Sequence, residues 1–314
     1  MIYLCMAAPV ICIGTIMVDE LFFCREHAVS ATSNPAIIKR YAGGVAGNIA
    51  RNLAMLQVPV QLVTVVGSDR DGDWLLDCFR QAGVSTAMLQ QVEEHTGKYA
   101  SVINADGSLF VAACADECSK YISPAYLQGI TGELAHAAMI IIDTNIEATA
   151  INWVLQFARD HSIPLVIEPV SVVKARKLAT MDLSGVFMIT PNEDEVASVC
   201  NSNHNDSAGC LVELLHRGIQ QIWLRKGEKG SLICDKDGSH LLGVPDIEVA
   251  DSTGAGDAAL AGWIAAYYNG SGSYECLQAG HVMAMETLRV HGSVMDGFSI
   301  DELFKSIKKY YPDE

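Results

Sequence analysis

Short apolar runs alternate along this chain with segments whose apolar residues recur at helical spacing. The runs are apolar without alternation, which predicts strands buried on both faces, as in a parallel sheet. We expect these strands at residues 10–14, 60–67, 139–143, 165–169, 186–190 and 222–225, and helices at 47–56, 71–82, 146–161, 193–200 and 206–217. The alternation predicts an α/β sandwich that forms one domain over residues 1–314.

Two segments depart from this alternation. Residues 99–113 place the turn pair Asp106-Gly107 between runs rich in β-forming residues, which predicts a hairpin. Residues 22–41 are extended and polar, without a helical period. Together they predict a small sheet that serves as a lid or dimer surface, with two ordinary surface loops as the alternative. The core would then comprise 1–19, 42–94 and 118–314, and the lid 20–41 and 95–117.

Composition narrows the choice of partners. The chain has 314 residues, is 50% hydrophobic and 18% charged, and can therefore bury one large core. Its net charge of -16 argues against nucleic acid and against anionic membrane surfaces, which need clustered Lys and Arg. We see no apolar run of membrane-spanning length, and residues 1–16 lack the basic start of a signal peptide and are interpreted as a first strand. The expectation is a cytoplasmic protein that acts on small molecules.

Cysteine and histidine give no metal-ligand pattern. The ten cysteines are scattered through apolar runs, which favours buried, reduced thiols. Only Cys114 and Cys118 are close together, and no second pair completes a zinc site. His281 stands alone on an apolar helix and is interpreted as a packing residue.

Polar residues end several of the predicted strands. Asp143, Glu168 and the run Thr190-Pro191-Asn192 follow apolar segments directly. Open α/β sheets bind their ligands at this edge, so we expect the functional site there.

A turn of small residues with a carboxylate precedes an apolar helix predicted at 258–268. Its sequence is Asp251-Ser252-Thr253-Gly254-Ala255-Gly256-Asp257. The backbone at Gly254 and Gly256 can approach an anion closely, and the helix dipole adds partial positive charge. A carboxylate would repel a resident phosphate unless the site brings a hydroxyl and a phosphoryl group together. This favours Asp257 as the base and the turn as the anion hole.

Other interpretations of this turn remain. Asp251 or Ser252 can be an ordinary helix cap. Gly254-x-Gly256-x-x-Ala259, with Glu275 about twenty residues later, loosely fits the dinucleotide fingerprint of NAD(H)-dependent oxidoreductases. That fingerprint follows directly on an apolar strand, whereas the segment 245–250 before this turn is short and contains acidic residues. We therefore favour phosphoryl transfer over dinucleotide binding. The chain has no G-x-x-x-x-G-K-S/T loop, which excludes a Walker-type nucleotide site.

Three motifs in this order resemble the PfkB, or ribokinase-like, family of sugar and nucleoside kinases over essentially the whole chain. They are residues 42–48 before a helix, 191–195 after a strand, and 251–257. The resemblance implies a three-layer α/β/α sandwich with a small β-sheet lid, ATP as phosphoryl donor, and Mg²⁺. It implies Asp257 as catalytic base, with Gly254, Ala255 and Gly256 as the anion hole. A homodimer through the lid is usual for such relatives.

The resemblance also implies the binding residues. Asn192 and Glu195 match the N-x-x-E element that arranges Mg²⁺ and its waters, although an acidic helix start is the alternative. For the sugar, Gly43, Gly44 and Asn48 match the binding turn, with tight helix packing as the alternative for the glycines. Asp19 matches a carboxylate that binds paired hydroxyls, and its alternative is an acid in a solvated loop. For the nucleotide, the match is the turn with Lys226, Gly227 and Gly230, for which an exposed hairpin is the alternative. Asp251 and Thr253 match positions that in many members hold a monovalent cation such as K⁺, helped by the loop at 291–293.

The substrate is the point at which the sequence departs from the family. The runs 33–35, 43–54 and 169–171 resemble members that phosphorylate the 5′-hydroxyl of pseudouridine. Met17, however, stands where these kinases commonly carry Asn, and its thioether is only a weak acceptor. Ribose, another sugar or another nucleoside therefore remain alternative substrates. A nucleoside-binding protein without activity is the alternative from another class.

Overall fold

A large sheet forms the centre of the protein. The computed structural model describes residues 8–200, 207–290, 292–295 and 297–312, so part of the predicted first strand and Asp206 of a predicted helix lie outside the described residues. The sheet contains β1 (Val10–Ile13), β4 (Val60–Gly67), β5 (Ser85–Val92), β8 (Met139–Asp143), β9 (Leu165–Glu168), β10 (Met188–Ile189), β11 (Gln221–Arg225), β12 (Ser231–Asp235) and β13 (Gly238–Leu242). Their order is β13-β12-β11-β10-β9-β8-β1-β4-β5. Neighbours from β11 to β5 are parallel, and β12 and β13 complete the edge in antiparallel fashion.

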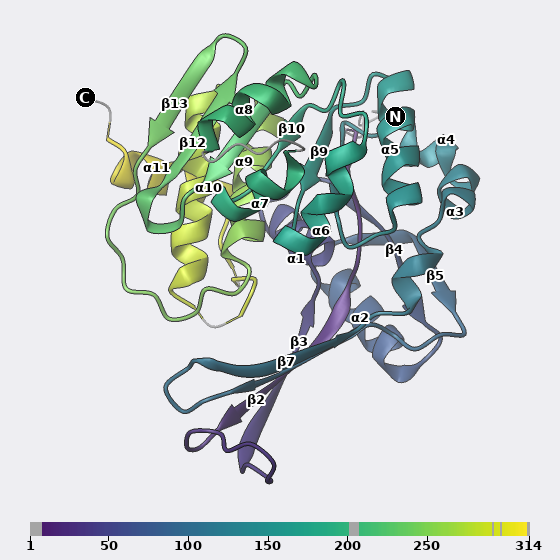
Figure 1. Cartoon of the computed structure of the whole chain (residues 1–314), viewed down its shortest axis with the longest axis vertical. Coiled ribbons are helices and arrows are strands. Elements are labelled where there is room, and N and C mark those ends of the chain that lie inside the picture. The colour runs from purple at the N-terminus through teal and green to yellow at the C-terminus, as the bar shows by residue number, and fades with distance from the viewer. Residues whose placement is uncertain (1–7, 201–206, 291, 296, 313–314) are drawn as a thin grey trace, which may run out of the picture.

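Helices cover both faces of this sheet (Figure 1). One face packs against α1 (Val45–Met55), α2 (Arg70–Gln81), α9 (Ala255–Tyr268), α10 (Ser273–Leu288) and α11 (Ile300–Tyr310). The other packs against α3 (Pro124–Gly129), α4 (Thr131–Leu134), α5 (Ala148–Asp160), α6 (Val172–Ala175), α7 (Glu193–Val199), α8 (Ser207–His216) and the short 3₁₀ helices η1 (Cys118–Tyr121) and η2 (Arg176–Thr180).

Strand β1 shows why the apolar runs are uninterrupted. Val10 and Cys12 belong to the apolar cluster on one face, whereas Ile11 and Ile13 belong to the cluster on the other. A strand covered on both faces needs apolar side chains at every position. The predicted α/β/α sandwich is confirmed. No helix of the described residues is long and apolar enough to cross a membrane.

A second sheet of four strands projects from the core (Figure 1). β2 (Met17–Cys24) pairs antiparallel with β3 (Ala36–Gly43) and parallel with β6 (Lys98–Ile103), which forms a hairpin with β7 (Leu109–Ala115). The hairpin turn has Gly107 at φ 85°, a conformation that favours glycine. The two segments that interrupt the helix–strand alternation therefore form one sheet, and the surface-loop alternative is wrong.

The sequence pattern erred in one central strand, β10, and towards the two edges of the large sheet. Only Met188–Ile189 of the run at 186–190 is a strand, and β5, β12 and β13 were not predicted. In β5 and β13 the side chains are mostly partly or fully exposed, because these strands lie at the two edges. Edge strands lack the continuous apolar runs that mark buried strands.

Candidate active site

The N-terminus of α9 places Asp257 at the carboxyl end of the large sheet. Gly254 precedes this helix at φ 73°, and a Cβ there would lie 2.5 Å from the Cα of Ser293, so only glycine fits. Asp257 Oδ2 accepts a hydrogen bond of 2.9 Å from Asn48 Nδ2, and Asn48 Oδ1 accepts one of 2.8 Å from Ser293 Oγ. The fold thus joins two motif residues that lie 209 positions apart.

The surroundings of Asp257 alter its acidity. Burial, helped by the nearby carboxylate of Glu168, raises the pKa of Asp257 to about 8 against the opposing effects of the hydrogen bond from Asn48 and the charge of Arg225. A carboxyl group that titrates near neutral pH is well matched to take a proton from a hydroxyl.

A charged network beside Asp257 includes a residue that the sequence analysis missed. Arg225, the last residue of β11, donates a 2.7 Å hydrogen bond to Glu168 Oε1. Thr190 Oγ1 donates a 2.7 Å hydrogen bond to the other oxygen of Glu168. The guanidinium also lies against the anion-hole turn, because a Cβ on Gly256 would be 2.7 Å from Arg225 Nη1. An arginine at the end of an apolar strand was the signal that could have revealed it.

Asn192 and Glu195 form a capping box at the start of α7. Asn192 Oδ1 accepts from the backbone of Glu195 at 2.8 Å, and Glu195 Oε2 accepts from the backbone of Asn192 at 2.9 Å. The acidic helix start considered from sequence is therefore present. Glu195 is nevertheless buried and lies 3.9 Å from Arg225, inside the site and not on the surface.

The predicted sugar-binding motif, Gly43 and Gly44 with Asp19, joins the second sheet to the core. Gly43 ends β3, and a Cβ on it would collide with the carboxylate of Asp19. Gly44 has φ 95°, and a Cβ there would collide with the Thr15 carbonyl oxygen. Burial raises the pKa of Asp19 to about 7, and no hydrogen bond to its carboxylate occurs within the described residues. Met17 is buried at the start of β2, paired with Gly43, and so lies beside this motif.

Asp143 fixes the same turn from behind. Its buried Oδ2 accepts 3.1 Å hydrogen bonds from the backbones of Thr15 and Ala46, and its Oδ1 accepts one of 2.8 Å from Asn145. Burial raises the pKa of Asp143 to about 6. This carboxyl group connects the ends of β1 and β8 with the start of α1.

Lys174 and Asn145 are further residues that the sequence analysis missed. Lys174 follows β9 in the short helix α6 and donates a hydrogen bond to Asn145 Oδ1 at the end of β8. Burial raises the pKa of the Cys114 thiol on β7, and the charge of Lys174 opposes that rise. The charge of Lys174 therefore acts both on Asp143 in the core and on Cys114 in the second sheet. A helix of four residues leaves no periodic signal in sequence.

The turn after β11 carries the predicted nucleotide-binding residues. It forms the 3₁₀ helix η3 (Gly227–Lys229), with Gly227 at φ 57° and Gly230 at φ 84°. Both glycines line the cleft described below, whereas Lys226 does not and lies 3.8 Å from Glu193.

A cleft of about 670 Å³ contains much of this machinery, including Asp257, Asn192, Glu195 and Arg225. Its volume is typical of a small-molecule site. Apolar side chains also line it, among them those of Val244, Ile247, Val249, Ala284 and Leu288.

His281 also lines the cleft. Its Nε2 lies 2.7 Å from Ser231 Oγ and its Nδ1 lies 3.1 Å from the Tyr311 hydroxyl. Burial lowers the pKa of His281 to about 4, so the ring is neutral at physiological pH. His281 therefore packs in the core, as interpreted from sequence, and also takes part in a chain of hydrogen-bond contacts between Ser231 and Tyr311.

The predicted cation residues meet behind the anion-hole turn. Asp251 Oδ1 accepts from the backbone of Thr253 at 2.9 Å, and its Oδ2 accepts from the backbone of Gly292 at 3.1 Å. His291 of the same loop lies outside the described residues. The described residues contain no cluster of three or more His, Cys, Asp or Glu side chains that could hold a metal ion.

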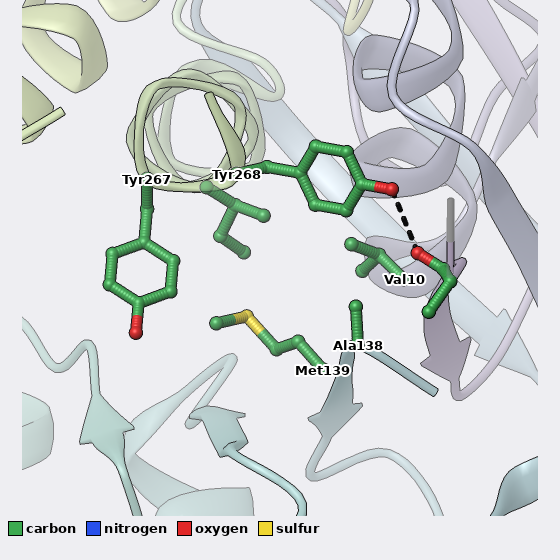
Figure 2. A pocket seen from close by; sticks show the side chains of 7 residues that line it. Val10, Ala138, Met139, Tyr267 and Tyr268 are labelled. Carbon is green, nitrogen blue, oxygen red and sulfur yellow. Dashed lines mark hydrogen bonds between the residues drawn. The ribbon is translucent and has the colours of Figure 1, made fainter. Parts of the chain in front are cut away.

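A second hollow, of about 350 Å³, is lined by Val10, Ala138, Met139 and the two tyrosines Tyr267 and Tyr268 (Figure 2). It is formed where β1 and β8 begin and α9 ends, and Tyr268 donates a 2.8 Å hydrogen bond to the Ala8 carbonyl there. The length of α9, at 1.5 Å per residue, separates it from Asp257 by roughly 15 Å. Its lining contains no carboxylate or basic side chain.

Comparison with known proteins places the chain in a class. The profile of the pfkB family carbohydrate kinases matches residues 7–296, and the chain belongs to this family. It is 30% identical over 263 residues to the uncharacterized sugar kinase YeiI of Escherichia coli, covering 82% of this chain and 72% of that protein. It is 31% identical over 266 residues to the pseudouridine kinase of Escherichia coli, covering 83% of this chain and 84% of that protein.

Solved structures share the fold. A carbohydrate kinase from Agrobacterium tumefaciens superposes with a TM-score of 0.84 at 24% identity, over 96% of this chain and 97% of that one. Arabidopsis thaliana ribokinase complexed with ribose and ATP gives a TM-score of 0.83 at 20% identity, over 96% of this chain and 99% of that one. The expected ribokinase-like fold is confirmed. The protein is thus a phosphotransferase of the carbohydrate and nucleoside kinase class, and the oxidoreductase interpretation is wrong.

Proposed function

We propose that this kinase transfers the γ-phosphoryl group of ATP to the 5′-hydroxyl of a nucleoside, and that the nucleoside is pseudouridine. The observation that carries the proposal is the hydrogen bond between Asp257 and Asn48, which joins the anion-hole turn to the sugar-binding motif. The 31% identity to a pseudouridine kinase supports this substrate.

The proposed reaction follows from the position of Asp257. Its carboxylate accepts the proton of the 5′-hydroxyl while that oxygen forms a bond to the γ-phosphorus. The bond between the γ-phosphorus and the oxygen bridging to the β-phosphate breaks, and ADP leaves with the electron pair. The backbone N–H groups of the turn at Gly254, Ala255 and Gly256 meet the charge on the phosphoryl oxygens.

The residues at the start of α7 fit a hydrated Mg²⁺. The capping box fixes Glu195 through one oxygen, and no hydrogen bond to its Oε1 occurs within the described residues. Mg²⁺ supplies charge neutralisation of the phosphates and keeps several waters, so a single carboxylate and the Asn192 amide suffice to orient it. We propose K⁺ or another monovalent cation near Asp251 and Thr253 as a further requirement.

The acceptor side offers polar groups that suit a nucleoside. Strand register aligns Tyr41, Asp19, Tyr99 and Cys114 in one row across the second sheet, beginning beside the Gly43 turn. Asp19 would bind the ribose hydroxyls. The charge of Lys174 acts on Cys114 at the end of this row, and we propose that its ammonium donates to a carbonyl oxygen of the base. Pseudouridine presents two such oxygens and two ring N–H groups, whereas ribose presents none.

We further propose a homodimer through the second sheet. Ile37 and Ile38 on β3 are 57% and 60% exposed, and Leu109 and Val111 on β7 are 60% and 52% exposed. Apolar side chains gathered on the strands of one small sheet suit the matching surface of a second copy. Sedimentation at micromolar concentration would test it.

ADP release by the purified protein with Mg-ATP tests the reaction and the substrate together. The acceptors would be pseudouridine, uridine, adenosine, ribose and fructose, with Asp257→Asn as control. Turnover confined to pseudouridine and abolished by the substitution supports the proposal. Turnover on another acceptor, such as ribose, keeps the mechanism and rejects the substrate. Melting stabilised by a nucleoside without any ADP release would favour the binding-protein alternative.

A further inference from the structure

The charge balance of the cleft points to one side chain. Arg225 is the only arginine or lysine among the described residues that line it, whereas five carboxylate side chains line it: Glu168, Glu195, Glu228, Asp246 and Asp257. A triphosphate that enters such a site meets net negative charge. Mg²⁺ compensates part of that charge, and the remaining cation available from this wall is Arg225.

The guanidinium of Arg225 is held in one place. Glu168 accepts its hydrogen bond, and Glu168 is itself fixed by Thr190 and by the backbone N–H of Val170 at 3.3 Å. On its other side Arg225 Nη1 abuts Gly256. The charge of Arg225 also acts on Asp257. This arrangement fixes the fork of the guanidinium between the anion-hole turn and the start of α7.

We propose that Arg225 is a catalytic residue that contacts the phosphoryl group in flight, and that Glu168 is the positioning residue that holds it there. This inference rests on the kinase site at Asp257 and is independent of which hydroxyl accepts the phosphoryl group. An arginine fork can donate two parallel hydrogen bonds to phosphoryl oxygens, and it stays charged at every physiological pH.

The reaction shows why this position matters. As the bond to ADP breaks and the bond to the acceptor forms, negative charge spreads over the equatorial phosphoryl oxygens. Donors already fixed beside those oxygens stabilise the transition state more than the ground state, which raises kcat. Gly256 has no side chain, so the guanidinium can lie directly beside the turn.

Two variants and one matched control test the proposal. Arg225→Met removes the charge and Arg225→Lys keeps it without the fork. Arg217→Met is the control, because Arg217 is a partly buried arginine outside this cleft that donates to the carbonyls of Val199, Leu178 and Met181. Steady-state rates would be measured with whichever acceptor the wild type phosphorylates, together with melting temperature.

The expected result is a loss of kcat with little change in binding. Arg225→Met should lower kcat about 10²- to 10³-fold, and Arg225→Lys about 10-fold or more, while the KM of the acceptor changes less than about threefold. Arg217→Met should lower the melting temperature and leave kcat near that of the wild type. Calorimetry should show that Arg225→Met loses tight binding of Mg-ADP with aluminium fluoride, which mimics the phosphoryl group in flight, and retains binding of Mg-ADP.

Other results would overturn the inference. A folded Arg225→Met that keeps kcat within about threefold of the wild type would do so, as would unchanged binding of the fluoride complex. Glu168→Gln and Arg225→Met could also lose kcat by the same factor, and only as much as their melting temperatures fall. In that case the ion pair stabilises the packing of β9 against β11 and Arg225 does not contact the phosphoryl group. A wild type that phosphorylates ribose but no nucleoside rejects the substrate proposed above and leaves this test intact.

Discussion

The two sides of the site differ in how completely the protein satisfies its own polar groups. On the side proposed for catalysis, each of three carboxylates accepts a hydrogen bond from the protein. The donors are Asn48 for Asp257, Arg225 for Glu168, and the backbone of Asn192 for Glu195. On the acceptor side no hydrogen bond to the Asp19 carboxylate occurs within the described residues, and all seven residues of β7 are exposed. The difference teaches that the protein itself holds in place the groups proposed for phosphoryl transfer, whereas it leaves open the surface proposed for recognition.

Asp257→Asn changes the side of the site that the protein holds in place, and it should have the largest effect on kcat. We expect kcat to fall on the order of 10³-fold, because the amide cannot accept the proton of the hydroxyl. ADP release over a range of enzyme concentrations measures this, and Asp237→Asn, a change at an exposed carboxylate outside the cleft, is the control. Retention of more than about a tenth of the wild-type rate would mean that another group is the base.

The same substitution should stabilise the fold. The pKa of Asp257 in the folded protein is about 8 and its ordinary value is 3.8, so the folded state holds the proton more tightly than the unfolded chain. The free energy of unfolding therefore falls as pH rises from about 4 to about 8, and Asn removes that loss. We expect Asp257→Asn to melt above the wild type at pH 7, with the difference shrinking towards pH 4. An equal difference at both pH values would contradict the raised pKa.

The sequence predicted some residues of the site and not others. The turn at Gly254 and Asp257 could be found because its backbone conformation and its chemistry demand particular residues in one short run. Arg225 could be noticed only as an arginine that ends an apolar strand, and Lys174 left no signal. The partners of these two residues, Glu168 and Asn145, are brought near only by folding. Apolar runs likewise predict the buried strands and leave the exposed edges unmarked.

Gly254→Ala tests how rigid the anion hole must be. Gly254 and Gly270 have similar conformations, at φ 73° and φ 87°, but a Cβ collides with Ser293 at the first position and meets nothing within 4 Å at the second. Both alanines should lose about 1–2 kcal/mol to the left-handed backbone. Gly254→Ala should lose more and should also lower kcat, as denaturant unfolding and rate measurements would show. Equal losses of stability and rate for the two variants would argue against a rigid turn.

Lys174→Met tests the side of the site proposed to bind the acceptor. If Lys174 binds the base, kcat/KM for the nucleoside should fall about 10-fold or more relative to kcat/KM for ribose, because ribose has no base to lose contact with. Lys177→Met is the matched control, since Lys177 donates to the carbonyls of Thr144 and Ile146 and should affect stability without altering that ratio. A ratio equal to that of the wild type would remove Lys174 from substrate recognition.

The smallest expected effect concerns the link between the two sides. If Asp257 is the base, kcat/KM should rise with pH through a pKa near 8, because only the ionised carboxylate accepts the proton. The hydrogen bond from Asn48 lowers that pKa, so Asn48→Ala should move the rise to higher pH. Ser293→Ala is the comparison, because it removes the bond to Asn48 and leaves the bond to Asp257, and it should move the profile less. If Asn48→Ala lowers the rate equally at every pH, Asn48 binds substrate without setting the acidity of Asp257, and the two sides of the site act independently.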